Sequence, residues 1–301
     1  MQDLPYQENP EWKEILKHLS RIRETVDYSP QNIEFIREQL QSFDDRIRGG
    51  AALAAEGCLF EPYILDLVFE IAENDGNPAI RKAAIQTLSQ VIHEGVMQNM
   101  EDEIGASTAV DDVEEWEEYQ AGDLRDDYLR VRHLLMNLLE DEDDPEMQEL
   151  ALFGLADLGF LPEVREKIAD FISSNRKASQ LVALKAMGRY PQYWEDHLEA
   201  MITPDAPTDI LQEAISACYS SDSSRLAKAI EGVLEHSNPE VLRFALLTLA
   251  NINKSENLAD ILQQFSLHQD TIVQEAARDG LELINKKNFS DFLRTDLGME
   301  D

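Results

Sequence analysis

A short alanine-centred pattern recurs along this chain of 301 residues, and it constrains the fold more than any other feature. In its clearest copy, Ile80 is followed four residues later by Ala84, and Ala84 four residues later by Leu88. The steps between successive central alanines span 31–33 residues, except for one step of 67, which is about two periods. A fixed period of this length is typical of repeat proteins. The central alanines are Ala51, Ala84, Ala151, Ala183, Ala214, Ala245 and Ala276.

Each repeat is predicted to be a pair of helices. Apolar residues recur at three- and four-residue steps, as the buried face of a helix requires, and no sustained two-residue alternation indicates a strand. A pair of about 30 residues cannot bury its own apolar face, so successive pairs must stack. We therefore predict an all-α protein, an α-solenoid of about seven antiparallel helix pairs with an acidic loop insertion. The expected partner helices are 62–72, 124–139, 162–173, 192–201, 224–235 and 258–265.

Helix starts are marked by a capping residue followed by proline. A side-chain oxygen before the first turn accepts a hydrogen bond from a free backbone N–H, and proline tolerates the first helical position. The acidic run that ends at Asp144 is therefore predicted to be a turn whose last residue caps the next helix. The four capping pairs are Ser29-Pro30, Asn77-Pro78, Asp144-Pro145 and Asn238-Pro239.

The repeated frame resembles the second helix of HEAT repeats: a turn with Asp or Asn, often Pro, then Val/Ile-Arg, two variable residues, Ala and a later Leu. Arg48 and Arg81 match the arginine of that family. The resemblance covers roughly residues 30–285 and implies a HEAT/armadillo-like superhelix, with short repeats similar to those of the bacterial PBS-lyase-like branch. The residues at the arginine position of the other copies depart from the family: Gln148, Gln180, Leu211, Leu242 and Val273.

An acidic stretch interrupts the repeats, and no Lys or Arg occurs between Lys82 and Arg125. Like charges at this density resist packing, which favours an excursion loop. The alternative is a decayed repeat whose Val110, Val113 and Trp116 still touch the core. The expected organisation is a capping helix with two repeats in residues 1–95, this insertion or decayed repeat in 96–123, further repeats in 124–295 and a tail in 296–301.

The charge balance restricts the partners. Lys and Arg total 26 against 60 Asp and Glu, a formal net charge of −34. Such a surface repels phosphate backbones and anionic lipids, so we expect no nucleic-acid or membrane partner. The acidity either steers a basic protein partner or is a generally solvated surface, such as one adapted to high salt. Because there is no 18-residue apolar run and no signal pattern, we expect a cytoplasmic protein.

Residues that could perform chemistry are sparse. Cys58 and Cys218 lie far apart in apolar contexts and are expected to be buried thiols. Deoxyhypusine hydroxylases are HEAT proteins that bind two irons through several His-Glu pairs, whereas this chain has one such pair, His93-Glu94. The phosphate-loop, dinucleotide, zinc-protease and nucleophile-elbow motifs do not occur. We expect no catalytic residue, no cofactor and no metal, and favour a protein that is not an enzyme.

The predicted function is a non-enzymatic binding scaffold or adaptor. In HEAT-like arrays the second helices usually line the concave face, so side chains beside the buried frame are the candidate contacts. Phe153, Leu211, Leu242 and Leu247 are apolar where the period predicts partial exposure, although packing against a neighbouring helix is the alternative. The acidic loop could engage a basic partner segment. The candidate partner-binding residues are Arg48, Arg81, Gln86, Phe153, Lys185, Leu211, Leu242, Leu247 and Arg278, with Glu114, Glu115 and Trp116 in the loop.

Two other functions are compatible with the same fold. One is a maturation factor resembling the bilin lyases, which attach or remove a chromophore on phycobiliproteins. The other is a chaperone or exchange-factor helper. A HEAT-like fold by itself distinguishes neither from a scaffold.

Overall fold

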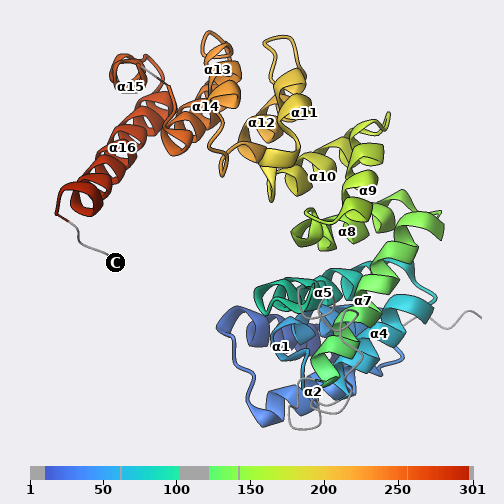
Figure 1. Cartoon of the computed structure of the whole chain (residues 1–301). Coiled ribbons are helices and arrows are strands. Elements are labelled where there is room, and N and C mark those ends of the chain that lie inside the picture. The colour runs from blue at the N-terminus through green and yellow to red at the C-terminus, as the bar shows by residue number, and fades with distance from the viewer. Residues whose placement is uncertain (1–10, 62, 102–121, 142, 256, 298–301) are drawn as a thin grey trace, which may run out of the picture. The chain divides into compact units, whose positions relative to one another are not determined.

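The computed structural model describes residues 11–61, 63–101, 122–141, 143–255 and 257–297, and the regular structure in these ranges is entirely helical. The chain divides into two compact units, Met1–Leu158 and Gly159–Asp301 (Figure 1). Each unit is built from helix pairs in which an outer first helix packs on a second helix. The all-α class predicted from the repeats is thus confirmed.

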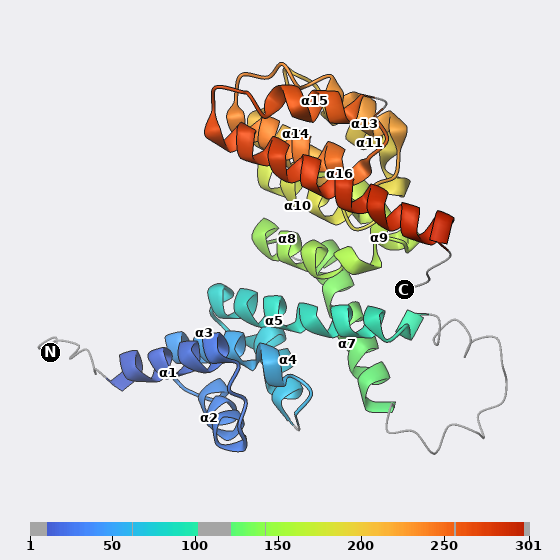
Figure 2. The same ribbon diagram turned by 90° about the vertical axis from the view of Figure 1, so that its left-hand side faces the viewer.

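The N-terminal unit begins with a capping helix that packs on the second helix of the first pair. Three pairs follow, α2 with α3, α4 with α5, and α7 with α8. Figure 2 shows α1, α3 and α5 lying side by side, and α5 in turn packs on α8. The helices are α1 (Glu11–Thr25), α2 (Pro30–Leu40), α3 (Asp45–Ala54), the 3-10 turn η1 (Ala55–Cys58), α4 (Ile64–Asn74), α5 (Pro78–Met97), α7 (Gly122–Asp141), α8 (Pro145–Gly154) and the 3-10 turn η3 (Ala156–Leu158).

The C-terminal unit continues the same arrangement with four pairs. The second helices α10, α12, α14 and α16 pack each on the next, as Figure 2 shows for α14 and α16. The elements are α9 (Pro162–Ile172), α10 (Lys177–Met187), the 3-10 turn η4 (Pro191–Tyr193), α11 (Glu195–Met201), α12 (Thr208–Ala217), α13 (Ser224–Glu231), α14 (Pro239–Ile252), α15 (Leu258–Phe265) and α16 (Thr271–Leu297).

The seven central alanines occupy the positions that the period predicts, one on each second helix. All are buried, with at most 3% of the residue exposed. A methyl group at this place lets neighbouring helices approach closely, while the larger apolar residues fill the space between pairs.

The long step between Ala84 and Ala151 has a local explanation. The helices on both sides of the acidic stretch, α5 and α7, are long, with 20 residues each. Within this unit α5 packs directly on α7 and α8. The pair α7–α8 therefore follows α5 as the next repeat. Val110, Val113 and Trp116, on which the decayed-repeat alternative rests, lie outside the described residues.

The predicted caps form at three of the four sites. The side-chain oxygens of Asn77, Asp144 and Asn238 accept hydrogen bonds from the backbone N–H two residues later, at 2.9–3.0 Å. The expected cap at Ser29 is wrong: its backbone is extended, as at an N-cap, but its hydroxyl makes no capping bond. Proline at the next position suffices to start α2 there.

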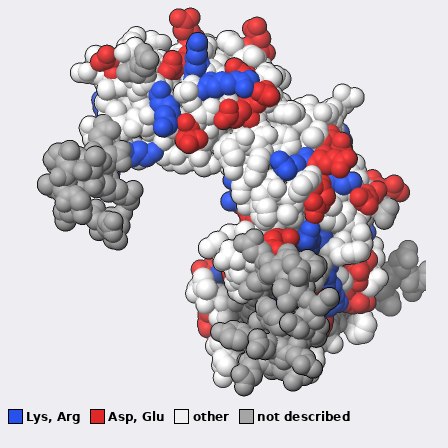
Figure 3. Space-filling view, viewed as in Figure 1, with Lys and Arg blue, Asp and Glu red and all other residues white. Residues whose placement is uncertain are grey.

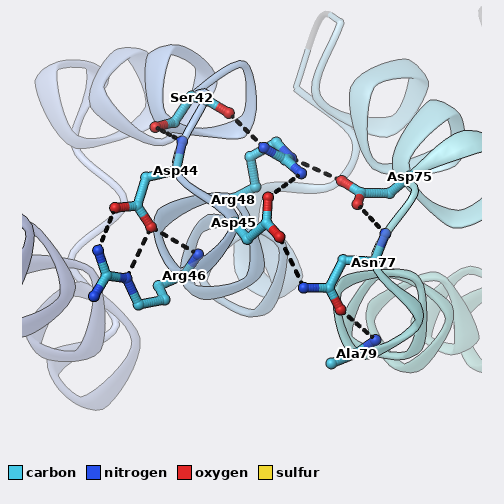
Figure 4. A network of polar contacts seen from close by, with 8 residues as sticks. All are labelled: Ser42, Asp44, Asp45, Arg46, Arg48, Asp75, Asn77 and Ala79. Atoms are coloured by element: carbon cyan, nitrogen blue, oxygen red, sulfur yellow. Dashed lines mark hydrogen bonds and ion pairs between the residues drawn. The ribbon is translucent and has the colours of Figure 1, made fainter. Parts of the chain in front are cut away.

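A polar network joins the first two pairs of the N-terminal unit at their turns (Figure 4). The Arg48 guanidinium lies 2.7 Å from Asp75 and 2.9 Å from Asp45, and it also donates to the Ser42 carbonyl oxygen at 2.9 Å. The Asn77 side-chain amide donates to Asp45 at 2.8 Å, so the network crosses from one pair to the next. Only 5% of the Asp75 side chain is exposed, so this ion pair is shielded from water.

Asp75 is expected to make stability depend on pH. Its hydrogen bond with Arg48 lowers the pKa of the Asp75 carboxyl below the ordinary value, against the opposing effect of burial. A carboxyl with a lowered folded-state pKa stabilises the fold fully above its unfolded pKa of about 3.9, and loses that contribution as pH falls through the folded value. Asp75→Asn should therefore lower the free energy of unfolding at pH 7 by about 1–3 kcal/mol.

The deficit of this variant should shrink as the pH drops below about 4. Urea unfolding at a series of pH values measures it. Asp66→Asn is a suitable control because Asp66 pairs with Arg130 on the surface, with 64% of its side chain exposed, where exposed pairs contribute about 0–1 kcal/mol. A deficit of Asp75→Asn that stays constant down to pH 3 would contradict the assignment.

Candidate protein-binding surface

The residues two positions after each central alanine form the outer row, which faces away from the packed frame. Gln86, Phe153, Lys185 and Arg278 are exposed there, as predicted, and Leu247 is partly exposed. Phe153 is the large apolar member, with 49% of the residue exposed. The complete outer row is Leu53, Gln86 and Phe153 in the N-terminal unit, and Lys185, Ser216, Leu247 and Arg278 in the C-terminal unit.

The residues three positions before each central alanine lie instead at the seam between neighbouring pairs. The expected exposure of Leu211 and Leu242 is wrong, because they are 0% and 4% exposed on helices that pack on both neighbours. Arg48 and Arg81 are directed into the turns, where Arg81 donates to the Ala72 carbonyl oxygen at 3.0 Å. Gln180 donates in the same way to the carbonyl oxygen of Ser174 at 2.8 Å.

Three successive second helices of the N-terminal unit bring their outer-row residues into one hollow, the Phe153 hollow. Its volume is about 100 Å³. The floor is fixed, since the buried Thr87 hydroxyl donates to the Ala52 carbonyl oxygen at 2.9 Å and thereby ties α5 to α3. The Phe153 hollow is lined by Leu53, Glu56, Gln86, Gln90, Leu150 and Phe153, among others.

A larger hollow, the Phe60 hollow, adjoins the first and shares Glu56 and Gln90 with it. Its volume is about 650 Å³, within the range of roughly 300–1,000 Å³ common for ligand pockets. Its lining comes from η1 and the turn after it, from the end of α5 and from α7. Phe60 is 51% exposed at this hollow. The polar and aromatic lining residues are Glu56, Phe60, Glu61, Gln90, Glu94 and Asp127, among others.

The electrostatics of the Phe60 hollow are acidic. Among the described residues, four carboxylates line it and no Lys or Arg does. Glu56 is partly neutralised, because the Arg23 guanidinium donates to its carboxylate at 2.9 and 3.1 Å. The uncharged Gln90 amide also donates to Glu56, at 3.3 Å. Glu61 and Glu94 are exposed. The hollow therefore favours a cationic group and repels an anionic one.

The surroundings of the potentially reactive residues near this surface do not activate them. Burial raises the pKa of the Cys58 thiol to about 11, so it stays protonated and unreactive at neutral pH. The His93 ring nitrogen Nδ1 lies 2.9 Å from an Asp157 carboxylate oxygen, whereas Glu94 lines the Phe60 hollow. Among the described residues, no group of three His, Cys, Asp or Glu side chains converges as a metal site would require.

The described Lys and Arg side chains on the face shown in Figure 3 form no basic patch. They are scattered among Asp and Glu. No helix in the described ranges combines the length and apolar character that crossing a bilayer requires. Glu114, Glu115 and Trp116, the loop residues predicted to bind a partner, lie outside the described residues.

Part of this surface was missed by the sequence reasoning. Leu53 belongs to the outer row of the first repeat, and the period alone could have identified it. Glu56 and Phe60 could not be found in this way, because they lie on η1 and in the turn after it, beyond the repeated frame.

The chain is similar to solved structures of other proteins at low sequence identity. No protein-family model and no curated protein matches the chain. A designed armadillo repeat protein is 16% identical, with 72% of this chain and 98% of its own covered and a TM-score of 0.42. Escherichia coli YibA is 14% identical over 83% and 98%, with a TM-score of 0.37. Human deoxyhypusine hydroxylase, solved with glycerol, is 10% identical over 92% and 99%, with a TM-score of 0.27. At these scores the similarity assigns neither a family nor an activity.

Proposed function

We propose that this chain is a protein-binding scaffold that holds a segment of its partner on the outer row of the N-terminal unit. One observation carries the proposal: Leu53, Gln86 and Phe153, from three successive second helices, line the same hollow. A half-exposed aromatic side chain in a hollow with apolar neighbours is the kind of position that becomes an interaction hot spot.

The chemistry of the surface indicates a basic partner. The adjoining Phe60 hollow is lined by carboxylates, and the whole chain carries a net charge of −34. Charge of one sign steers an oppositely charged partner toward the surface and mainly raises the association rate. We include Glu114, Glu115 and Trp116 in the proposal as a second source of attraction. Lys185, Leu247 and Arg278, at the equivalent positions of the C-terminal unit, are proposed as contacts of that unit in its own right.

Exchange of a single exposed aromatic residue tests the proposal. Proteins that the intact chain captures from a lysate of the cells that produce it would first be purified. Calorimetry would then measure their affinity for the intact chain and for Phe153→Ser. We expect binding to weaken at least tenfold, about 1.4 kcal/mol, because an anchoring aromatic is lost. Phe43→Ser is the matched control, since Phe43 is fully exposed between α2 and α3 of the same unit, away from both hollows.

The two variants should fold alike because both positions are exposed, which circular dichroism can check. The proposal fails if Phe153→Ser binds the captured protein as tightly as the intact chain does. It also fails if Phe43→Ser weakens binding to the same extent, since the outer row would then have no special role.

A further inference from the structure

The two adjoining hollows specify the chemistry of what they bind, an inference that rests on the proposed function. The Phe60 hollow, about 650 Å³, has room for more than one side chain, whereas the Phe153 hollow, about 100 Å³, has room for the end of one. Because they share Glu56 and Gln90, neighbouring side chains of one peptide segment can occupy both.

The lining of the Phe60 hollow favours a cationic occupant. Glu61 and Glu94 add exposed negative charge to this hollow, whereas Arg23 neutralises Glu56 in part. None of the described lining residues is Lys or Arg. A metal ion fits poorly, because hard cations such as Ca²⁺ need six to eight oxygen ligands, and the described carboxylates do not converge into a metal-binding group. An organic cation, which can contact separated carboxylates, fits this arrangement.

Phe60 favours arginine over a compact ammonium group. A planar guanidinium stacks on aromatic faces and forms several directed hydrogen bonds at once, so it can use an aromatic rim and carboxylates together. The same unit already contains such stacking: the Arg130 guanidinium lies 3.8 Å from the ring centre of Phe69, and that of Arg46 lies 4.0 Å from Trp12. Phe60 is half-exposed at the acidic hollow and offers a comparable face.

The Phe153 hollow adds an apolar requirement. Leu53, Leu150 and Phe153 contribute apolar side chains to it, next to the shared Glu56 and Gln90. We propose that the paired hollows recognise a peptide segment of the partner in which arginine lies beside a large apolar residue, with the arginine in the Phe60 hollow and the apolar side chain in the Phe153 hollow.

The test uses the full chain and three fluorescein-labelled Gly-Ser peptides. The first carries two arginines beside a leucine, the second has serine in place of leucine, and the third has glutamines in place of the arginines. Fluorescence anisotropy at low salt measures each affinity. We expect the arginine–leucine peptide to bind at least tenfold more tightly than either of the others.

Charge variants then locate the binding. The double variant Glu61→Gln/Glu94→Gln should weaken binding of the arginine–leucine peptide at least tenfold. Glu38→Gln/Glu70→Gln is the matched control, because it removes two exposed carboxylates of the same unit, on α2 and α4. Both doubles change the net charge equally, from −34 to −32, and the control should change the affinity less than twofold.

Phe153→Ser should weaken binding of the arginine–leucine peptide but leave the affinity of the serine peptide unchanged. This variant therefore separates the contributions of the two hollows. Equal weakening by the two charge doubles would overturn the inference, because the attraction would then be diffuse. So would equal affinity of the three peptides, or no measurable binding of the arginine–leucine peptide. The peptides can give one of these results while Phe153→Ser still weakens binding of the captured partner. In that case the scaffold proposal stands, and only the assignment of arginine to the Phe60 hollow is wrong.

Discussion

Replacing Tyr128 by alanine is expected to lower the free energy of unfolding of the N-terminal unit by about 3–5 kcal/mol, the cost of removing a buried aromatic side chain. Tyr128 lies on α7 and is fully buried. Its ring rests on the backbone of α5 at Gly95, where an added Cβ would lie 2.2 Å from a ring carbon. Its hydroxyl donates to Glu101 at 2.5 Å, and Arg132 pairs with the same carboxylate at 2.9 Å.

Tyr128→Phe separates packing from hydrogen bonding. The ring stays in place, and Glu101 keeps Arg132 as its partner, so this variant should lose only about 1–2 kcal/mol. Urea unfolding followed by circular dichroism measures both variants, with an unchanged dependence on urea concentration as the check that the same surface unfolds. If phenylalanine were as costly as alanine, the hydroxyl rather than the ring would hold α5 and α7 together.

Gly95 explains why this contact was not visible in the sequence. Gly95 lies in the last turn of α5, and glycine is common near helix ends, so its presence there did not indicate a packing role. The close approach of a tyrosine from the next helix supplies the reason for it, and that contact spans the acidic stretch. The period identified one helix on each side of the stretch, but it contains no information about contacts specific to one pair.

The fold itself was largely predictable, because alanine at a fixed period reports on a close helix contact that every pair repeats. The surface was only half predictable. The period correctly placed Gln86 and Phe153 outside, but it treated the position three before the central alanine as equally outward. That position is polar in the first four repeats, as at Arg48, which donates to a turn carbonyl, and apolar in the last three, as at Leu211, which is buried. A position that holds both polar and apolar residues lies at a seam between helix pairs. There a side chain either donates a hydrogen bond to a backbone carbonyl of the turn or fills the core.

The Phe60 hollow is lined by residues outside the repeated frame, so the repeat pattern could not predict it. Glu56 lies on η1 and Phe60 in the turn that follows it, and Asp127 belongs to the first helix of another pair. Their separation along the chain gave no signal that they line one space. Net charge sums over residues wherever they lie, so it favours a basic partner from the sequence alone, and that expectation stays a prediction.

Replacing Ala183 by leucine should lower the free energy of unfolding of the C-terminal unit by about 2–3 kcal/mol, because the added atoms overpack a close helix contact. Ala183 is fully buried on α10, which packs on both α9 and α12. The backbones of α10 and α12 come close at their ends: a Cβ added at Gly188 would lie 3.1 Å from the Ala217 Cα atom. Leucine has nearly the helix propensity of alanine, so propensity contributes little to the expected loss.

Ala178 on the same helix supplies a control of identical chemistry, since it is exposed. Ala178→Leu should change the free energy of unfolding by no more than about 0.5 kcal/mol, as is usual for surface substitutions. Urea unfolding of the two variants side by side measures the difference. Equal stability of the two would mean that the buried alanine does not mark a close helix contact. The physical explanation of the repeat would then fail, because nothing else in the frame requires a residue as small as alanine at that position.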